Sequence, residues 1–198
     1  KLSSDLGGKY FSFHAGFLLD PNVKDLGKRI KKSNLFSRKE SLSLFIENVI
    51  KLSDFSKGFG IDLLVENNDI SLNNFNEFKS NPFLMTDPDE CNYVMSQLPS
   101  SVNLLVDVAH LKVSANSLNF NPVRLLDLCN NRIKAYHLSD NDGKSDTNMA
   151  ISEKSWFWNH IDLNLDYYTI EVYNSNPKVL VQQLKLVLHN IGIKVFQQ

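Results

Sequence analysis

Short apolar runs that end on an acid or a histidine recur five times along the chain. In the clearest, residues 103–107, leucine and valine lead into Asp107, and His110 follows three residues later. A continuous apolar run of this kind is typical of a strand buried on both faces of a parallel sheet. The five predicted strands cover 9–13, 61–66, 103–107, 133–137 and 167–171, and the other four lead into His14, Glu66, His137 and Glu171.

Helical spacing and capping signals separate these strands. Ser37 and Glu40 fit a capping box, before a helix that we expect to end in a left-handed glycine within residues 57–60. Asp87 and Pro88 open a second helix as N-cap and first-turn residues. Other helices are predicted at 123–129, 156–161 and 178–189, a last short strand at 193–196, and loops at 16–34, 67–81 and 139–152.

Strand and helix alternate along the chain, which predicts a parallel sheet with right-handed crossovers in one domain, 1–198. Ligand-type side chains at successive strand ends favour an α/β fold of the (β/α)8 TIM barrel type over an open doubly wound sheet. In a barrel every strand end surrounds one axis, whereas an open sheet gathers its chemistry at one switch point. A full barrel takes about 250 residues. We therefore expect this chain to lack the first one or two βα units of the barrel.

Composition excludes several classes of function. A formal net charge of −1 and a pI near 6.6 leave no global basic footprint, so a nucleic-acid partner is not expected. No apolar run reaches the roughly eighteen residues of a membrane span, and no signal peptide is visible. Cys91 and Cys129 lack metal or disulfide spacing, which favours buried free thiols and a cytoplasmic location. The sequence leaves open whether the protein forms a homo-oligomer.

One loop is locally basic. Its cations are Lys24, Lys28, Arg29, Lys31 and Lys32. We interpret this stretch as a solvated loop, with a phosphate contact near the site as the alternative.

Glu66, Asp107, His137 and Glu171 form the candidate ligand set for a divalent metal. Three carboxylates and an imidazole on one axis would repel one another unless a cation lay between them. Three oxygen donors and one nitrogen suit Mn²⁺, Mg²⁺, Zn²⁺ or Co²⁺. The alternative is that each acid separately caps a helix or pairs with a lysine. His14 and His110 are candidates for second-site ligands, acid/base groups or substrate donors.

The runs FSFHAG, LLVENN, LLVDVAH, IKAYHLSDNDGKSD and YTIEV resemble the xylose isomerase-like TIM barrel superfamily. That group includes sugar isomerases and epimerases and the endonuclease IV type of abasic-site nuclease. The resemblance implies that Glu66, Asp107, His137 and Glu171 occupy the shared metal-ligand positions. It also implies that His110 matches a histidine that contacts substrate in the epimerases and binds a further zinc in the nucleases. His14 matches a zinc ligand of the nucleases.

Departures from the family pattern favour the sugar branch. The nucleases carry Asp-x-His where this chain has Asp146-Thr147-Asn148, and Asn148 is a poor zinc ligand. Asp140 and Asp146 remain additional site candidates.

The favoured function is a divalent-metal-dependent isomerase or epimerase of carbohydrate metabolism, acting on a small sugar or sugar phosphate. Glu66 and Glu171 would move a proton on the carbon next to a carbonyl, through a metal-bound enediolate, while His110 donates to a substrate oxygen. The alternatives are an abasic-site phosphodiesterase and a non-catalytic barrel remnant that acts as a binding module.

Overall fold

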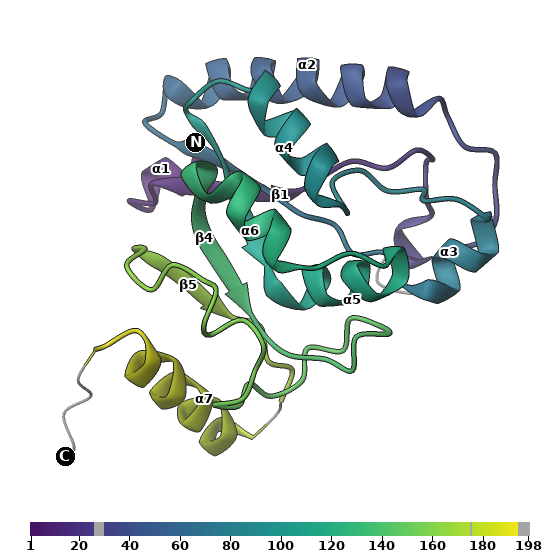
Figure 1. Ribbon diagram of the computed structural model, residues 1–198. Helices are drawn as coiled ribbons and strands as arrows, with labels where there is room; N and C mark the ends of the chain where they lie inside the picture. Colours follow the sequence, from purple (N-terminus) through teal and green to yellow (C-terminus); the bar gives the residue numbers. More distant parts are fainter. Residues whose placement is uncertain (26–29, 175, 194–198) are drawn as a thin grey trace.

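The computed structural model describes residues 1–25, 30–174 and 176–193 of the chain. Within these ranges one parallel sheet holds its strands in chain order: β1 (Tyr10–His14), β2 (Asp62–Glu66), β3 (Val102–Asp107), β4 (Ile133–Leu138) and β5 (Tyr167–Ile170). The helices are α1 (Leu2–Asp5), α2 (Arg38–Lys57), α3 (Leu72–Phe78), α4 (Pro88–Gln97), α5 (Val108–Leu118), α6 (Val123–Cys129) and α7 (Pro177–Asn190), with 3₁₀ turns η1 (Val23–Asp25) and η2 (Asn130–Arg132). The predicted parallel sheet is confirmed (Figure 1).

The sheet curls until its two edges face each other. Tyr10 lies in β1 and Tyr167 in β5, at opposite edges, yet their ring centroids are 4.6 Å apart in an edge-to-face contact. Tyr10 also packs on a small cluster of inward-facing side chains, Leu64, Leu105 and Ala135. The five strands therefore enclose an inner space as a half-barrel does.

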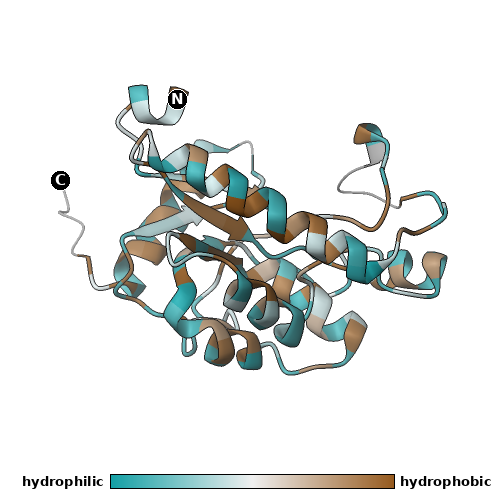
Figure 2. Cartoon of the chain, turned by 90° about the horizontal axis from the view of Figure 1, so that it is seen from above, coloured by the Kyte–Doolittle hydropathy of each residue, from teal (hydrophilic) through white to brown (hydrophobic). Residues whose placement is uncertain are grey.

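Alternation along the strands separates the core from the inner face. Leu63, Val65, Leu104 and Val106 pack outward in the large core cluster, which also contains side chains of the covering helices. Figure 2 shows this apolar character as brown stretches along the strands between the helices. The residues between them point inward, because successive side chains of a strand take opposite faces.

The strand register brings the ends of the strands to one rim. His14 is the Cα partner of Glu66, and Asp107 is the partner of His137. Glu171 follows β5 directly, and its backbone N–H donates to the carbonyl of Leu138 at 3.0 Å. These five side chains thus come from adjacent positions at the carboxyl edge of the sheet.

The predicted helix starts at Ser37 and Asp87 are confirmed. Ser37 is the N-cap of α2, where its hydroxyl accepts from the N–H of Glu40 at 3.5 Å. Asp87 is the N-cap of α4 and accepts from two backbone N–H groups. At the end of α2, Gly60 takes the left-handed conformation with φ +65°, whereas Gly58 stays right-handed with φ −61°.

Two predicted segments differ from the structure, and one helix was not predicted. Residues 67–81 contain the short helix α3, which asparagine-rich composition had indicated as loop; Ser71 caps it. Residues 108–118 form α5, for which no element was predicted; Asp107 both ends β3 and caps α5, so no loop marks the start of this helix. Residues 156–161 form turns rather than a helix.

Some expectations concern residues at or outside the described ranges. Lys28 and Arg29 of the basic loop, and positions 194–196 of the predicted last strand, lie outside them.

Cys91 and Cys129 are buried free thiols, as expected. Among the described helices, none combines the length and apolar character needed to cross a bilayer.

Asn68 ties the segment after β2 to two other segments of the rim. Its Nδ2 lies 3.0–3.1 Å from the carbonyl oxygens of Ala15, Gly16 and Leu84. Asn68→Ala is expected to lower the free energy of unfolding by about 1–3 kcal/mol, because buried carbonyls lose their donor. Urea titration measures the change. The exposed Asn76→Ala is the control, expected to stay within about 0.5 kcal/mol; equal effects of the two variants would contradict the assigned role.

Candidate metal and substrate site

The four predicted metal ligands meet around the imidazole of His137. Its Nδ1 lies 3.1 Å from Glu66 Oε1 and 3.1 Å from Glu171 Oε1. Asp107 Oδ2 lies 4.0 Å from the same nitrogen. Glu66 and Asp107 are buried, whereas the Glu171 side chain is 30% exposed. Side chains spread over a hundred positions of chain therefore converge at one end of the sheet.

Asp107 carries an observation that favours a cation. Its Oδ1 accepts from the N–H groups of Ala109 and His110, at 2.7 and 2.8 Å, and so caps α5. Its Oδ2 is buried and has no hydrogen-bond partner among the described residues. A buried acceptor left unpaired costs about 1–3 kcal/mol, and more when it is charged. A bound cation would satisfy this oxygen.

The geometry of the donors also fits a metal ion. Ligand atoms of Glu66, Asp107 and His137 all lie within 4.8 Å of one another. Oxygen donors with one imidazole nitrogen suit a hard or borderline divalent cation. Glu171 adds a fourth donor next to His137.

When no cation is bound, a proton on His137 supplies part of the positive charge that balances the carboxylates. Burial acts to lower the pKa of His137, but the hydrogen bond with Glu66 and the charges of Glu66 and Glu171 outweigh it and raise the pKa. Burial acts to raise the pKa of Glu66, but the hydrogen bond with His137 and the charge of His14 leave that pKa lowered. The site thus holds positive charge among its carboxylates.

Asp107→Asn is expected to stabilise the metal-free protein at neutral pH. Burial raises the pKa of Asp107 from 3.8 to about 6. The stability that this carboxyl contributes is therefore complete below about pH 4 and is lost as the pH rises through 6. The raised pKa corresponds to on the order of 3 kcal/mol. Urea titration of chelator-treated protein should show the variant gaining on the wild type from pH 4 to 6; a difference independent of pH would contradict the raised pKa.

His110 is held in place by Asn67, a residue that the sequence analysis did not single out. The Nδ1 of His110 lies 2.9 Å from the carbonyl oxygen of Asn67, so this nitrogen carries the hydrogen. The Asn67 side chain also pairs with the backbone of Asp107, accepting from its N–H at 2.8 Å and donating to its carbonyl at 3.2 Å. Its position directly after Glu66 was the only signal in the sequence.

The other nitrogen of His110 faces acids. Its Nε2 lies 3.4 Å from Asp146 Oδ2 and 3.9 Å from Asp107 Oδ2. Burial acts to lower the pKa of His110, but these two carboxylates outweigh it and hold the pKa well above its usual range. His110 is therefore a charged donor in the metal-free site.

The remaining candidates lie in different surroundings. His14 is exposed at the rim, and its Nδ1 lies 3.8 Å from Glu66 Oε2. With Glu66 and His110 it forms a second group of potential ligand atoms within 4.8 Å of one another. Asp140 instead accepts from Lys112 Nζ at 2.6 Å and from Ser155 Oγ at 2.7 Å. Asp140 is thus paired with a lysine, and the structure does not bring it into the cluster. Of the four candidate ligands, Asp107 does cap a helix, α5, through one of its two oxygens.

A cavity of about 440 Å³ opens beside the cluster. Its lining includes His110 and Glu171, so the cavity adjoins the proposed ligands. The two loops that we expected over the site both contribute: Asp69 comes from the segment after β2, and Asp146 and Asn148 from the segment after β4. Asp69 is half-buried, and burial raises its pKa. The sequence analysis did not single it out, because nothing in a polar loop distinguishes one aspartate from another.

Comparisons with known proteins find likeness in structure alone. No protein-family model matches the chain, and no curated protein matches its sequence. A D-tagatose 3-epimerase-like protein matches with a TM-score of 0.68 at 16% identity, over 96% of this chain and 64% of that protein. The D-psicose 3-epimerase of Clostridium cellulolyticum H10 matches with a TM-score of 0.63 at 11% identity, over 94% and 64%.

A third solved structure contains a metal. It is a xylose isomerase-like TIM barrel protein from Mycobacterium smegmatis in complex with magnesium, with a TM-score of 0.62 at 13% identity, over 96% of this chain and 63% of that protein. This chain spans less than two thirds of the length of each of the three proteins. The predicted partial (β/α) barrel is confirmed.

Proposed function

We propose that this chain, which has the fold of the xylose isomerase-like TIM barrels, is a divalent-metal-dependent isomerase or epimerase of a small sugar. The observation that carries the proposal is the convergence of Glu66, Asp107, His137 and Glu171 at one end of the sheet, beside a cavity. The names of two structural neighbours, a D-tagatose 3-epimerase-like protein and a D-psicose 3-epimerase, support a sugar as substrate.

Glu171 is the better placed of the two glutamates to act on a substrate carbon. Its side chain is 30% exposed and lines the cavity, whereas that of Glu66 is 6% exposed and does not. The proposed ligands would hold a cation whose charge, when bound, stabilises negative charge on substrate oxygens and so acidifies the adjacent C–H bond. The carboxylate of Glu171 takes the proton from that carbon as general base.

Glu66 is the second acid/base group. Its carboxylate lies among His14, His110 and His137, and its lowered pKa keeps it ionised at neutral pH. In an epimerase a proton returns to the opposite face of the carbon, so a bound substrate would have to reach from the cavity to the buried Glu66. Glu66 would relay this proton from the histidines around it.

His110 orients the substrate through one nitrogen. Because Nδ1 donates to the carbonyl of Asn67, Nε2 is the nitrogen that can donate to a substrate oxygen. It faces Asp146, which lines the cavity. A substrate hydroxyl or carbonyl between them would take up this hydrogen bond.

The proposal is tested by exchange of substrate protons with solvent. The Mn²⁺-loaded protein is incubated in D₂O with D-fructose, D-psicose, D-tagatose and D-fructose 6-phosphate, and ¹H NMR follows the positions next to the carbonyl. We expect deuterium to enter at one such carbon of at least one ketose, and chelation of the metal to abolish the exchange. Absence of exchange with every ketose would contradict the proposal and would favour the non-catalytic binding module.

An abasic-site phosphodiesterase is the second candidate. The observation in its favour is the further group of ligand atoms from His14, Glu66 and His110, which offers room for another ion. Cleavage of an abasic duplex by the metal-loaded protein, with a steep loss of binding as salt rises, would support this activity. An intact duplex after incubation would exclude it.

A further inference from the structure

We infer that the cavity selects an uncharged polyol, a free sugar rather than a sugar phosphate, and that Asn148 and Asp146 contact its hydroxyl groups. The inference rests on the proposed function and names the substrate class of that same site. It follows from two residues of the cavity lining that each hold a buried, unpaired acceptor, and from the charge of that lining.

Asn148 is a buried residue of the cavity lining. Its side chain lines the cavity, the residue is 3% exposed, and Oδ1 has no hydrogen-bond partner among the described residues. Its backbone is in the left-handed region, with φ +46°, where asparagine is one of the few residues tolerated. The carbonyl of Asn148 accepts from the N–H of Tyr173 at 2.9 Å, and the next residue, Met149, forms an antiparallel bridge with Asp140. These contacts fix the backbone of Asn148 at the wall of the cavity.

Asp146 supplies the second unpaired acceptor. Its Oδ2 faces Nε2 of His110 at 3.4 Å, while its Oδ1 is buried without a partner among the described residues. Both unpaired oxygens lie just below the accessible surface, and a small movement of either side chain would offer its acceptor to a ligand that donates hydrogen bonds. Sugar hydroxyls donate, whereas the oxygens of an ionised phosphate only accept, so this wall suits the sugar part of a ligand and not a phosphate.

The charge of the lining points the same way. Asp69, Asp146 and Glu171 line the cavity, and its described lining contains no lysine or arginine. Together with Glu66 and Asp107 beneath, these five carboxylates carry more negative charge than a divalent cation and a protonated His110 can neutralise. An anionic substituent placed here would be repelled at short range in a partly buried site.

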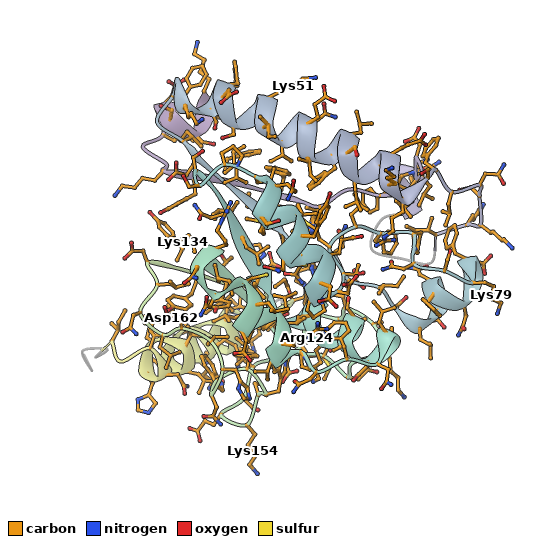
Figure 3. All side chains as sticks on the ribbon, turned by 45° about the horizontal axis from the view of Figure 1, so that its top comes forward. Lys51, Lys79, Arg124, Lys134, Lys154 and Asp162 are labelled. Carbon is orange, nitrogen blue, oxygen red and sulfur yellow. The ribbon has the colours of Figure 1, made fainter. Side chains whose placement is uncertain are left out.

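The lysines and arginines among the described residues lie outside the cavity lining. Figure 3 shows Lys51, Lys79 and Lys154 at the periphery of the molecule. Lys31 and Lys32, the described lysines nearest the cavity residue Ile30 in sequence, are exposed and do not line the cavity. The phosphate contact considered for the basic loop therefore has no described side chain to carry it.

The cavity also offers surface for the carbon skeleton of a sugar. Phe17, Ile30 and Phe83 line it together with the polar residues, and Tyr173, 80% exposed, borders it. Such a mixed lining suits a ligand with both hydroxyl groups and C–H faces.

Binding measurements on matched ligands test the inference. Isothermal titration of the Mn²⁺-loaded protein compares D-fructose, D-psicose and D-tagatose with D-fructose 6-phosphate. We expect at least one free ketose to bind about tenfold or more tightly than the phosphate, since like charges repel across the site. Equal or tighter binding of the phosphate, or binding of none of the four, would overturn the inference.

Two isosteric variants assign the selectivity to residues. Asp146→Asn removes a negative charge and should lower the ratio of free-ketose affinity to phosphate affinity several-fold. Asn148→Asp adds a negative charge and should raise this ratio. Asp142→Asn, in the same loop but exposed and outside the cavity, is the matched control and should leave the preference unchanged. Identical preferences in all three variants would contradict the roles of Asp146 and Asn148.

The two proposals fail in different ways. Deuterium exchange with D-fructose 6-phosphate but with none of the free ketoses would leave the isomerase proposal standing and overturn this inference. Preferential binding of free ketoses without exchange would support this inference and contradict the proposed reaction.

Discussion

Glu171→Gln is expected to abolish exchange of the substrate proton with solvent while cation binding persists. Glutamine has nearly the shape of glutamate, and its amide oxygen can stay near His137 Nδ1, which Glu171 Oε1 approaches to 3.1 Å. An amide cannot accept the proton from carbon, so the rate should fall by about 10³-fold, within the range usual for loss of a general base. Deuterium incorporation measured by ¹H NMR at saturating Mn²⁺ gives the rate.

The matched control replaces a glutamate that lies away from the cavity. Glu153→Gln, on an exposed turn, should exchange at the wild-type rate. Bound manganese is counted in each protein, so that loss of the cation and loss of the base are told apart. Exchange by Glu171→Gln at a rate close to that of the wild type, with the cation bound, would refute its role as base.

Asp107→Asn is expected to weaken cation binding by about a hundredfold or more. Mutation of a residue that only hydrogen-bonds a metal ligand already lowers metal affinity about 10–100-fold, and Asp107 is proposed as a ligand itself. The two oxygens of this carboxylate have different roles. Oδ1 caps α5, and the asparagine oxygen can still do so, whereas the unpaired Oδ2 becomes an NH₂ group that repels a cation. Isothermal titration with Mn²⁺ measures the loss.

Asp87→Asn provides a close control for this variant. Asp87 caps α4 through Oδ1 in the way that Asp107 caps α5, but lies outside the cluster. It should bind manganese with wild-type affinity. Wild-type affinity in Asp107→Asn as well would show that the buried Oδ2 is not a ligand.

The convergence of the site was readable from the sequence because it follows from strand period and parallel order. Side chains at the carboxyl ends of adjacent parallel strands must share a rim, and His14, Glu66, Asp107 and His137 all have the inward parity. Helix α5 was missed for a related reason. Asp107 ends β3 and caps α5 at once, so no loop residues separate the two elements.

The cavity wall was not readable, because it depends on which side chains of two polar loops turn inward. Asp140 and Asp146 lie in one loop and have the same chemistry, yet Lys112 binds the first and His110 faces the second. Asn67 supports the site by an amide pairing with the backbone of Asp107, forty residues away. Such contacts produce no periodic pattern of residues that could be recognised in the sequence.

The most direct test of the account is the position of a bound metal. Crystals of the protein grown or soaked with MnCl₂ give an anomalous difference map above and below the manganese edge. We expect one strong peak within bonding distance of Glu66, Asp107, His137 and Glu171. A map without a peak at these four side chains, or with manganese bound only elsewhere, would contradict the metal site and the reaction proposed for it.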